Sequence, residues 1–280
     1  MDTNQRGSEV LSPELRDIDF DKIRKKVFEL CGIDLHEGKR ELVKARLGKR
    51  LREGRFRSFK EYYQYIVTEE GAEELIAMID AISTNLTSFF REAGHFRKLE
   101  SLFPAMLNGT SGIPKINIWC AGCSTGEEAY SIAMTAREAM NRSAGLKIWA
   151  TDISTKVLKI AATGIYPEER VKKIPAELVK KYFAMGQGDW RGHYRVKNFL
   201  QESIEFARFN LMETLPGRDL FDIIFCRNVM IYFNKETQAA LVHRFYTCLK
   251  KGGHLFVGHS ESLTGLPHQF KYIEPSVYCK

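Results

Sequence analysis

A glycine-rich turn between Trp119 and Glu128 is the first segment whose residue types suggest a ligand site. The turn follows a short apolar run and precedes a helical pattern, which places it at the carboxyl end of a predicted strand, where open α/β sheets bind their ligands. Gly122, Ser124 and Gly126 do not match the dinucleotide spacing GxGxxG. A looser cofactor loop and a plain structural turn both account for this spacing.

Two carboxylates, Glu127 and Glu128, follow the turn at the start of the predicted helix. Acidic residues there complement the positive end of the helix dipole, which is one explanation of their presence. One of them can instead hold the amino group of a cationic ligand. The glycine spacing is close to the loop of methyltransferases that use S-adenosylmethionine (SAM), and SAM carries such an ammonium group.

Asp152 ends the next predicted strand. An acidic residue about 20 or more positions after a glycine turn commonly binds ribose hydroxyls. Helical signals follow Asp152 at once, so a helix N-cap is the alternative. Its spacing and strand position together favour the ribose role.

Polar residues also follow two later predicted strands. Asn210 and Leu211 come directly after one of them, and Arg227 and Asn228 after the next, with Tyr232 shortly behind. Ligands bind at such strand ends in open α/β sheets. Taken singly, these residues are equally explained by a surface pair, a helix cap or a core aromatic ring.

The segment 83–92 precedes the predicted sheet and interleaves polar with apolar residues. Its polar members include Asn85, Thr87 and Arg91. Capping chemistry between two helices explains such a pattern, and a polar lid across the ligand crevice is the functional alternative. Sequence spacing does not choose between the two.

The elements that must position these residues form two parts. Residues 1–18 carry little pattern and are predicted to be a flexible arm. Helical spacing follows through 19–82, with helices expected from Asp19 to Gly32, at 39–53, at 59–66 and at 75–82, and no strand before about residue 115. The first quarter is therefore predicted to be a small helical domain.

Strands and helices alternate in the remainder, which predicts an α/β domain over 83–280 with a largely parallel sheet. A stretch at about 164–202 interrupts this rhythm and is predicted to be a partly helical insertion with a small antiparallel sheet. The expected strands are 116–119, 146–150, 204–209, 221–226 and 255–257, and the expected helices are 129–139, 157–162 and 237–249, the last ended by Gly252 and Gly253.

Positive charge gathers on the helix predicted at 39–53. Val43, Leu47 and Leu51 share its apolar face, and basic residues lie opposite or extend that surface. A solvated helix face is the simpler explanation, and a site for an acidic partner is the functional one. The residues that we assign to such a site are Arg46, Lys49, Arg50 and Arg52.

Composition narrows the class of protein. The 280 residues include 42 Lys and Arg against 35 Asp and Glu, a net charge of +7 that favours acidic partners of any kind. No apolar run approaches the roughly 20 residues of a membrane span, and residues 1–20 lack the apolar core of a signal peptide, so a cytoplasmic address is expected. The six cysteines are then expected to be free thiols.

Five segments, in order along the chain, resemble the CheR family of chemotaxis protein-glutamate methyltransferases. They read TNLTSFFR at 84–91, GCSTGEEAYS at 122–131, TDI at 151–153, FDIIFCRNVMIYF at 221–233 and GHSE at 258–261. The second and fourth are specific together. The resemblance also covers the helical domain and the insertion.

The resemblance implies a class I SAM-dependent methyltransferase fold with a mainly parallel seven-stranded sheet. It implies that Arg91 and Tyr232 lie nearest the transferred methyl group. Glu127 is adjacent to Glu128, and the resemblance does not decide which of the two contacts the cofactor. The cofactor residues that it implies are Asn85, Thr87, Arg91, Glu128, Asp152, Asn210, Leu211, Arg227 and Asn228. We add Gly122 of the glycine turn and Glu127 to this set.

The implied reaction moves a methyl group from SAM to glutamate carboxylates of chemoreceptors and leaves S-adenosylhomocysteine, with no metal. The basic helix would face the receptor's methylation helices. In some family members the β-subdomain binds a receptor's C-terminal peptide by strand addition, which makes residues 164–202 a candidate for that partner. No nucleic-acid partner and no direct membrane insertion are implied.

Two other classes of function remain as alternatives. An RNA or small-molecule methyltransferase on the same fold would use the basic helices for phosphates, with a steep salt dependence, but the sequence has no RNP-type aromatic motif and no zinc knuckle. A non-catalytic module that binds SAM as a sensor is the third possibility, and the intact run of site residues argues against it.

Overall fold

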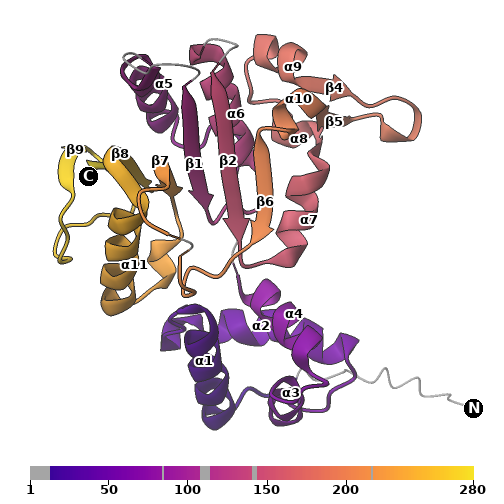
Figure 1. The fold of residues 1–280 in the computed structure, drawn as a ribbon. Coiled ribbons are helices and arrows are strands. Elements are labelled where there is room, and N and C mark those ends of the chain that lie inside the picture. The colour runs from indigo at the N-terminus through magenta and orange to yellow at the C-terminus, as the bar shows by residue number, and fades with distance from the viewer. Residues whose placement is uncertain (1–12, 84, 108–113, 141–143, 216) are drawn as a thin grey trace, which may run out of the picture. The chain divides into compact units, whose positions relative to one another are not determined.

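The computed structural model describes residues 13–83, 85–107, 114–140, 144–215 and 217–280. These residues fall into two compact units (Figure 1). The first draws its described residues from 1–30 and 34–84, and the second from 31–33 and 85–280. The first twelve residues of the predicted arm lie outside the described part of the chain.

The first unit is helical, as predicted. Val43 and Leu47 of α2, Phe59 of α3 and Met78 of α4 are fully buried, because each helix turns its apolar face toward the interior of the unit. Helix α1 begins two residues earlier than Asp19, which is itself buried and bound by Arg16 (Nε to Oδ2, 2.7 Å). The helices are α1 (Asp17–Cys31), the 3-10 turn η1 (Glu37–Lys39), α2 (Arg40–Glu53), α3 (Phe59–Ile66) and α4 (Ala72–Ile82).

The second unit is built on a seven-stranded sheet, which confirms the predicted fold class. Its strand order is β6-β2-β1-β7-β8-β10-β9 (Figure 1). Neighbours from β6 to β8 pair in parallel, and β10 pairs antiparallel with both β8 and β9. The strands are β1 (Lys115–Ala121), β2 (Gly145–Asp152), β6 (Ile204–Arg208), β7 (Phe221–Cys226), β8 (Leu249–Val257), β9 (Lys271–Glu274) and β10 (Val277–Cys279).

Both faces of this sheet are covered. Ile118 and Cys120 belong to one core cluster, and Trp119 and Ala121 belong to a second, because alternate residues of a strand point to opposite faces. The first cluster includes residues of α5 (Gly94–Leu107), α6 (Glu127–Ala139) and α7 (Thr155–Thr163), and the second includes residues of α11 (Lys235–Cys248). Two buried faces explain why the central strands are almost continuously apolar.

The interrupting stretch folds as predicted into short helices and a three-stranded antiparallel sheet of order β3-β5-β4. Strand β4 therefore lies at one edge of this small sheet. The elements are β3 (Ile165–Pro167), α8 (Glu168–Val171), α9 (Ala176–Tyr182), β4 (Phe183–Met185), η2 (Gly188–Trp190), β5 (His193–Val196) and α10 (Asn198–Gln201).

The predicted end of the helix at Gly252 and Gly253 is wrong, and so is the predicted start of the strand that follows. Gly252 and Gly253 were expected to end a helix, but α11 ends at Cys248 and β8 begins at the next residue. The glycine pair lies inside β8, where Gly252 has φ of 78°, a value that costs glycine little. Among the described residues, no helix is both long enough and apolar enough to cross a membrane.

Candidate active site

Arg227 stands at the centre of the candidate site, directly after β7. Its side chain is fully buried and binds two carboxylates, Glu128 Oε2 through Nη1 at 2.7 Å and Glu92 Oε2 through Nη2 at 2.9 Å. Nη2 also donates to the carbonyl oxygen of Arg91. A buried guanidinium needs such partners. The arrangement ties the ends of β1 and β7 to the segment 85–92.

Glu92 was not predicted from the sequence, yet it joins several site segments. Its Oε2 accepts the backbone N–H of His259 at 3.1 Å, and its Oε1 is 3.5 Å from Asn228 Nδ2. Burial pushes the pKa of Glu92 upward, but the hydrogen bond and charge of Arg227 outweigh burial, so the pKa lies below its ordinary value. Glu92 is therefore an ionised counter-charge to Arg227 at neutral pH.

The structure separates the two adjacent glutamates at the start of α6. Glu127 is fully buried, and its oxygens accept Arg170 Nη1 and the Thr125 hydroxyl, each at 2.6 Å. Glu128 is partly exposed, with Oε1 3.3 Å from the Cys120 thiol and Oε2 on Arg227. These contacts favour Glu128 as the carboxylate available to a cationic ligand.

The glycine turn has the backbone geometry that a close ligand needs. Gly122 and Gly126 have φ of 83° and 93°, and Ser124 lies in the same left-handed region at 49°. A Cβ on Gly122 would come within 2.4 Å of Val229 Cγ2. The turn is held to the end of β2, because the N–H groups of Gly122 and Cys123 both donate to the Thr151 carbonyl oxygen.

Asp152 does not cap the following helix, so that alternative is wrong. Ser154 caps α7 by accepting the Val157 N–H. The Asp152 carboxylate accepts the backbone N–H of Ser124 through Oδ2 and that of Ser154 through Oδ1, both at 2.9 Å. Each carboxylate oxygen can accept more than one hydrogen bond, so ribose hydroxyls can still be accommodated.

Asn85 contacts the glycine turn after β1, Thr87 contacts Arg170, which binds Glu127 at the start of α6, and Asn210 follows β6. The Asn85 carbonyl accepts the Ser124 hydroxyl at 3.1 Å. Asn210 and Leu211 follow β6, where the Phe209 N–H donates to the Asp152 carbonyl oxygen at 3.1 Å. Arg91 is partly exposed and donates through Nη1 to the Leu86 carbonyl at 2.8 Å, so the segment 85–91 folds back on itself.

Glu261 is a second residue that sequence reasoning missed, although it ends one of the matching strings. Its buried carboxylate accepts the N–H groups of Gly258 at 2.6 Å, Asn228 at 2.8 Å and Ile231 at 3.2 Å. Burial raises its pKa above the ordinary value even though these N–H groups lower it. Glu261 thereby fixes the turn that leads to the half-buried Tyr232.

The chemistry of these side chains fits SAM. Glu128 offers a carboxylate for its ammonium group, Asp152 offers oxygens for ribose hydroxyls, and Gly122 leaves the backbone open. All six cysteines are free thiols, as predicted. Burial and the nearby Glu128 charge raise the pKa of Cys120 well above its ordinary value, so this thiol is not a nucleophile at neutral pH.

Within the described residues, Glu92, His95 and His259 form one group of potential metal ligands, with ligand atoms within 4.8 Å of one another. The Glu92 carboxylate is already bound by Arg227, and that buried positive charge opposes a cation at the same oxygen. The absence of a metal from the reaction remains a prediction.

His95 makes the stability of the fold sensitive to pH. It is buried, and burial together with the Arg227 charge lowers its pKa from 6.5 to about 4. The unfolded chain takes up this proton near pH 6.5 and the folded chain only near pH 4, so the stabilisation is complete above pH 6.5 and is lost as pH falls toward 4. The loss should reach about 3 kcal/mol.

Urea denaturation at several pH values between 7 and 4 tests this prediction. The free energy of unfolding of His95→Asn should fall less steeply with acidification than that of the wild type. His243→Asn, which changes an exposed histidine of α11, is the matched control and should follow the wild type. Equal slopes for His95→Asn and the wild type would show that His95 does not carry the effect.

The four basic residues assigned to an acidic partner lie in the first unit and differ in their contacts. Arg46 donates to the Ile82 and Ser83 carbonyls at the end of α4, and Arg50 is ion-paired with Glu74. Lys49 and Arg52 are exposed. Arg46 and Arg50 therefore also stabilise the helical unit itself.

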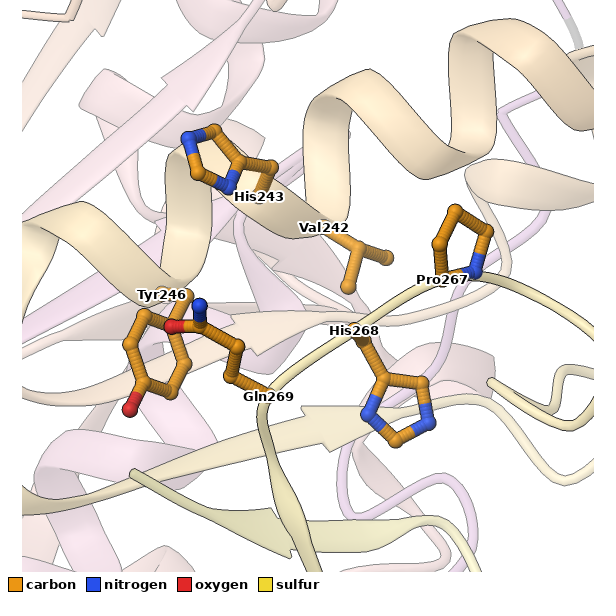
Figure 2. A pocket seen from close by; sticks show the side chains of 6 residues that line it. All are labelled: Val242, His243, Tyr246, Pro267, His268 and Gln269. Atoms are coloured by element: carbon orange, nitrogen blue, oxygen red, sulfur yellow. The ribbon is translucent and has the colours of Figure 1, made fainter.

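Two surface hollows lie beside α11. One, of about 240 Å³, is lined by His243 and Tyr246 of α11 and by His268 and its neighbours in the loop before β9 (Figure 2). The other, of about 390 Å³, is lined by residues 212–215, 217 and 218 and by the end of α11. Neither contains a predicted cofactor residue.

Comparison with known proteins identifies the family to which both parts of the chain are similar. Residues 85–279 match the family described as "CheR methyltransferase, SAM binding domain", and residues 18–83 match "CheR methyltransferase, all-alpha domain". "Chemotaxis protein methyltransferase 2" of Pseudomonas aeruginosa is 42% identical over 93% of this chain and 92% of its own length. "Chemotaxis protein methyltransferase" of Borreliella burgdorferi is 40% identical over 100% of this chain and 100% of its own length. The protein of the same name from Escherichia coli is 39% identical over 94% of this chain and 91% of its own length.

Proposed function

The chain belongs to the CheR family of chemotaxis methyltransferases, and we propose that it esterifies glutamate side chains of a chemoreceptor in the cytoplasm. As a SAM-dependent methyltransferase, it would leave S-adenosylhomocysteine. The observation that carries the proposal is the joined edge of the sheet, where Arg227 ties Glu128 of the glycine turn to Glu92 of the segment 85–92.

Named residues would hold the cofactor at this edge. Glu128 would bind the ammonium group of SAM and Asp152 its ribose. The rest of the cofactor would lie against Asn210, Leu211 and Asn228, and Gly122 would let it approach the backbone closely. The bound cofactor would supply an electrophilic methyl group on a sulfonium. The fixed turn at 228–231, held by Glu261, keeps these contacts in place.

The acceptor needs no general base. A glutamate side chain has an ordinary pKa near ~4.3 and is ionised at neutral pH. The protein must instead align the carboxylate oxygen with the methyl group and exclude water, and orientation of this kind can contribute about 7–11 kcal/mol at best. We assign this positioning to Arg91 and Tyr232.

Substitution of these two residues tests the assignment. Loss of one hydrogen bond to a charged group costs about 1.5–3 kcal/mol, so Tyr232→Phe and Arg91→Ala should each lower kcat roughly ten- to a hundredfold. Tyr272→Phe and Arg97→Ala change exposed residues of the same unit and are the controls. Full turnover by both Tyr232→Phe and Arg91→Ala would refute the assignment.

The receptor surface is proposed to meet α2 of the helical unit. Lys49 and Arg52 are exposed there, and receptor methylation helices present glutamate, so opposite charges would attract. A receptor's C-terminal peptide is proposed to add a strand to the edge strand β4, where Met185 and Trp190 are exposed nearby.

Transfer of labelled methyl groups from SAM tests the function as a whole. The acceptors are receptor cytoplasmic fragments, the same fragments with Glu→Gln changes at the methylation sites, and bulk RNA. Base-labile label on the receptor that disappears in the Gln variants is the expected result. Label on RNA alone would refute the receptor proposal, and SAM binding without any transfer would favour a sensor.

A further inference from the structure

Arg170 connects the inserted subdomain to two segments of the cofactor site. It lies on α8, and its Nη1 donates to Glu127 Oε1 at 2.6 Å and approaches the Thr87 carbonyl oxygen at 3.4 Å. Glu127 is the first residue of α6, directly after the glycine turn, and Thr87 belongs to the segment 85–92. One side chain of the insertion therefore touches both.

The carboxylate that Arg170 binds, Glu127, needs a positively charged partner. Glu127 is fully buried, and its other oxygen accepts the Thr125 hydroxyl at 2.6 Å. A buried carboxylate is costly unless it is paired and hydrogen-bonded. Within the described part of the chain, Arg170 is the ion-pair partner of Glu127. The buried side of the turn therefore depends on a charge supplied by the insertion.

A second contact joins the same parts. The buried Tyr166 of β3 donates its hydroxyl to the Thr125 carbonyl oxygen at 2.6 Å. The ring of Phe89, from the segment 85–92, packs edge-on against Tyr166 and Phe183, with ring centroids 5.0 and 5.6 Å apart. Ion pair, hydrogen bond and ring contacts thus hold the turn and the segment 85–92 in one arrangement.

We infer that Arg170 is a positioning residue for cofactor binding. It acts through Glu127 and Thr87 and touches neither the proposed ammonium site at Glu128 nor the acceptor. By fixing Glu127 it sets the start of α6, and therefore the direction of the neighbouring Glu128. This inference rests on the cofactor half of the proposed function and is independent of which acceptor is methylated.

Calorimetric titration of SAM into the full chain tests the inference. Arg170→Ala should raise the Kd for SAM at least about tenfold and raise the KM for SAM similarly, while kcat at saturating SAM stays within about threefold. Arg170→Lys keeps the charge and should recover part of the affinity. Arg191→Ala removes an exposed arginine of the same subdomain and should bind SAM like the wild type.

A double-mutant cycle separates positioning from loss of folding. If Arg170→Ala does not fold, Arg170→Gln combined with Glu127→Gln removes both charges together and leaves no unpaired carboxylate. The two changes should be strongly non-additive in the Kd for SAM. Additive effects, or a folded Arg170→Ala that binds SAM like the wild type, would overturn the inference alone. A wild type that does not bind SAM would overturn the proposed cofactor site with it.

Discussion

Arg227→Ala is expected to abolish nearly all activity, with kcat/KM lowered roughly a thousandfold. The substitution leaves the carboxylates of Glu92 and Glu128 facing each other without their common partner. Removing one partner from a buried ion pair costs about 3–5 kcal/mol, and about 4 kcal/mol of lost organisation corresponds to three powers of ten in rate. Steady-state kinetics and urea denaturation measure the two losses.

Arg244→Ala is the matched control for this prediction. Arg244 is also partly buried, but it donates to the carbonyl oxygens of Ala240 and Glu213 on the α11 side of the sheet. Its loss should lower stability modestly and leave kcat/KM within about threefold. An Arg227→Ala variant with activity within tenfold of the wild type would show that the joined edge is not needed for catalysis.

Gly126→Ala is expected to destabilise the cofactor turn by about 2–6 kcal/mol. Its φ of 93° is strained for any residue with a Cβ, at about 1–3 kcal/mol. The new Cβ would also come within 2.9 Å of both Ala161 Cβ and Tyr166 Oη and 3.1 Å of Ala161 Cα. Crowding of a packed site adds about 1–3 kcal/mol. The free energy of unfolding should fall, and the Kd for SAM should rise.

Gly192→Ala separates these two causes. Gly192 has φ of 81°, but a Cβ there would meet no atom within 4 Å. It should therefore show the backbone cost without the crowding and leave SAM affinity unchanged. If Gly126→Ala and Gly192→Ala lost equal stability, the packing of the turn against α7 and Tyr166 would contribute nothing.

The sequence predicted the edge of the sheet well but not the partners within it. Strand ends and polar residues could be read from periodicity, because an apolar run followed by a polar residue marks the carboxyl end of a strand. Glu127 and Glu128 looked equivalent because they are adjacent. Their environments differ through Arg170 and Arg227, which lie 43 and 99 residues further along the chain.

Glu92 and Glu261 escaped prediction for a related reason. Glu261 ends a matching string and Glu92 directly follows one, but neither residue type shows its partners. Glu92 binds Arg227 and the His259 N–H, and Glu261 binds backbone N–H groups. A backbone donor leaves no trace in residue type. Only the folded chain shows which carboxylate collects several of them.

The fold could be predicted where the periodicity of apolar residues was strong. The prediction failed for short strands, which are too short to show such a pattern. The central strands and the helices of both units follow from apolar spacing. Strands β9 and β10 were not located, since β9 lies at the sheet edge with Tyr272 and Ile273 exposed, and an edge strand lacks the apolar run of a buried one.

The joined edge has a consequence for how the protein is made. Glu92 pairs with a residue that is 135 positions later in the chain. At a synthesis rate of about 5–20 residues per second, the ribosome adds that arginine roughly 7–27 seconds after Glu92. Until then Glu92 and Glu128 lack their common ion-pair partner, and Arg227 does not yet connect the segment 85–92 to the start of α6. If SAM binds at this edge as proposed, it can stabilise only a chain whose translation has passed β7, so cellular SAM levels should affect the survival of finished chains and not of nascent ones.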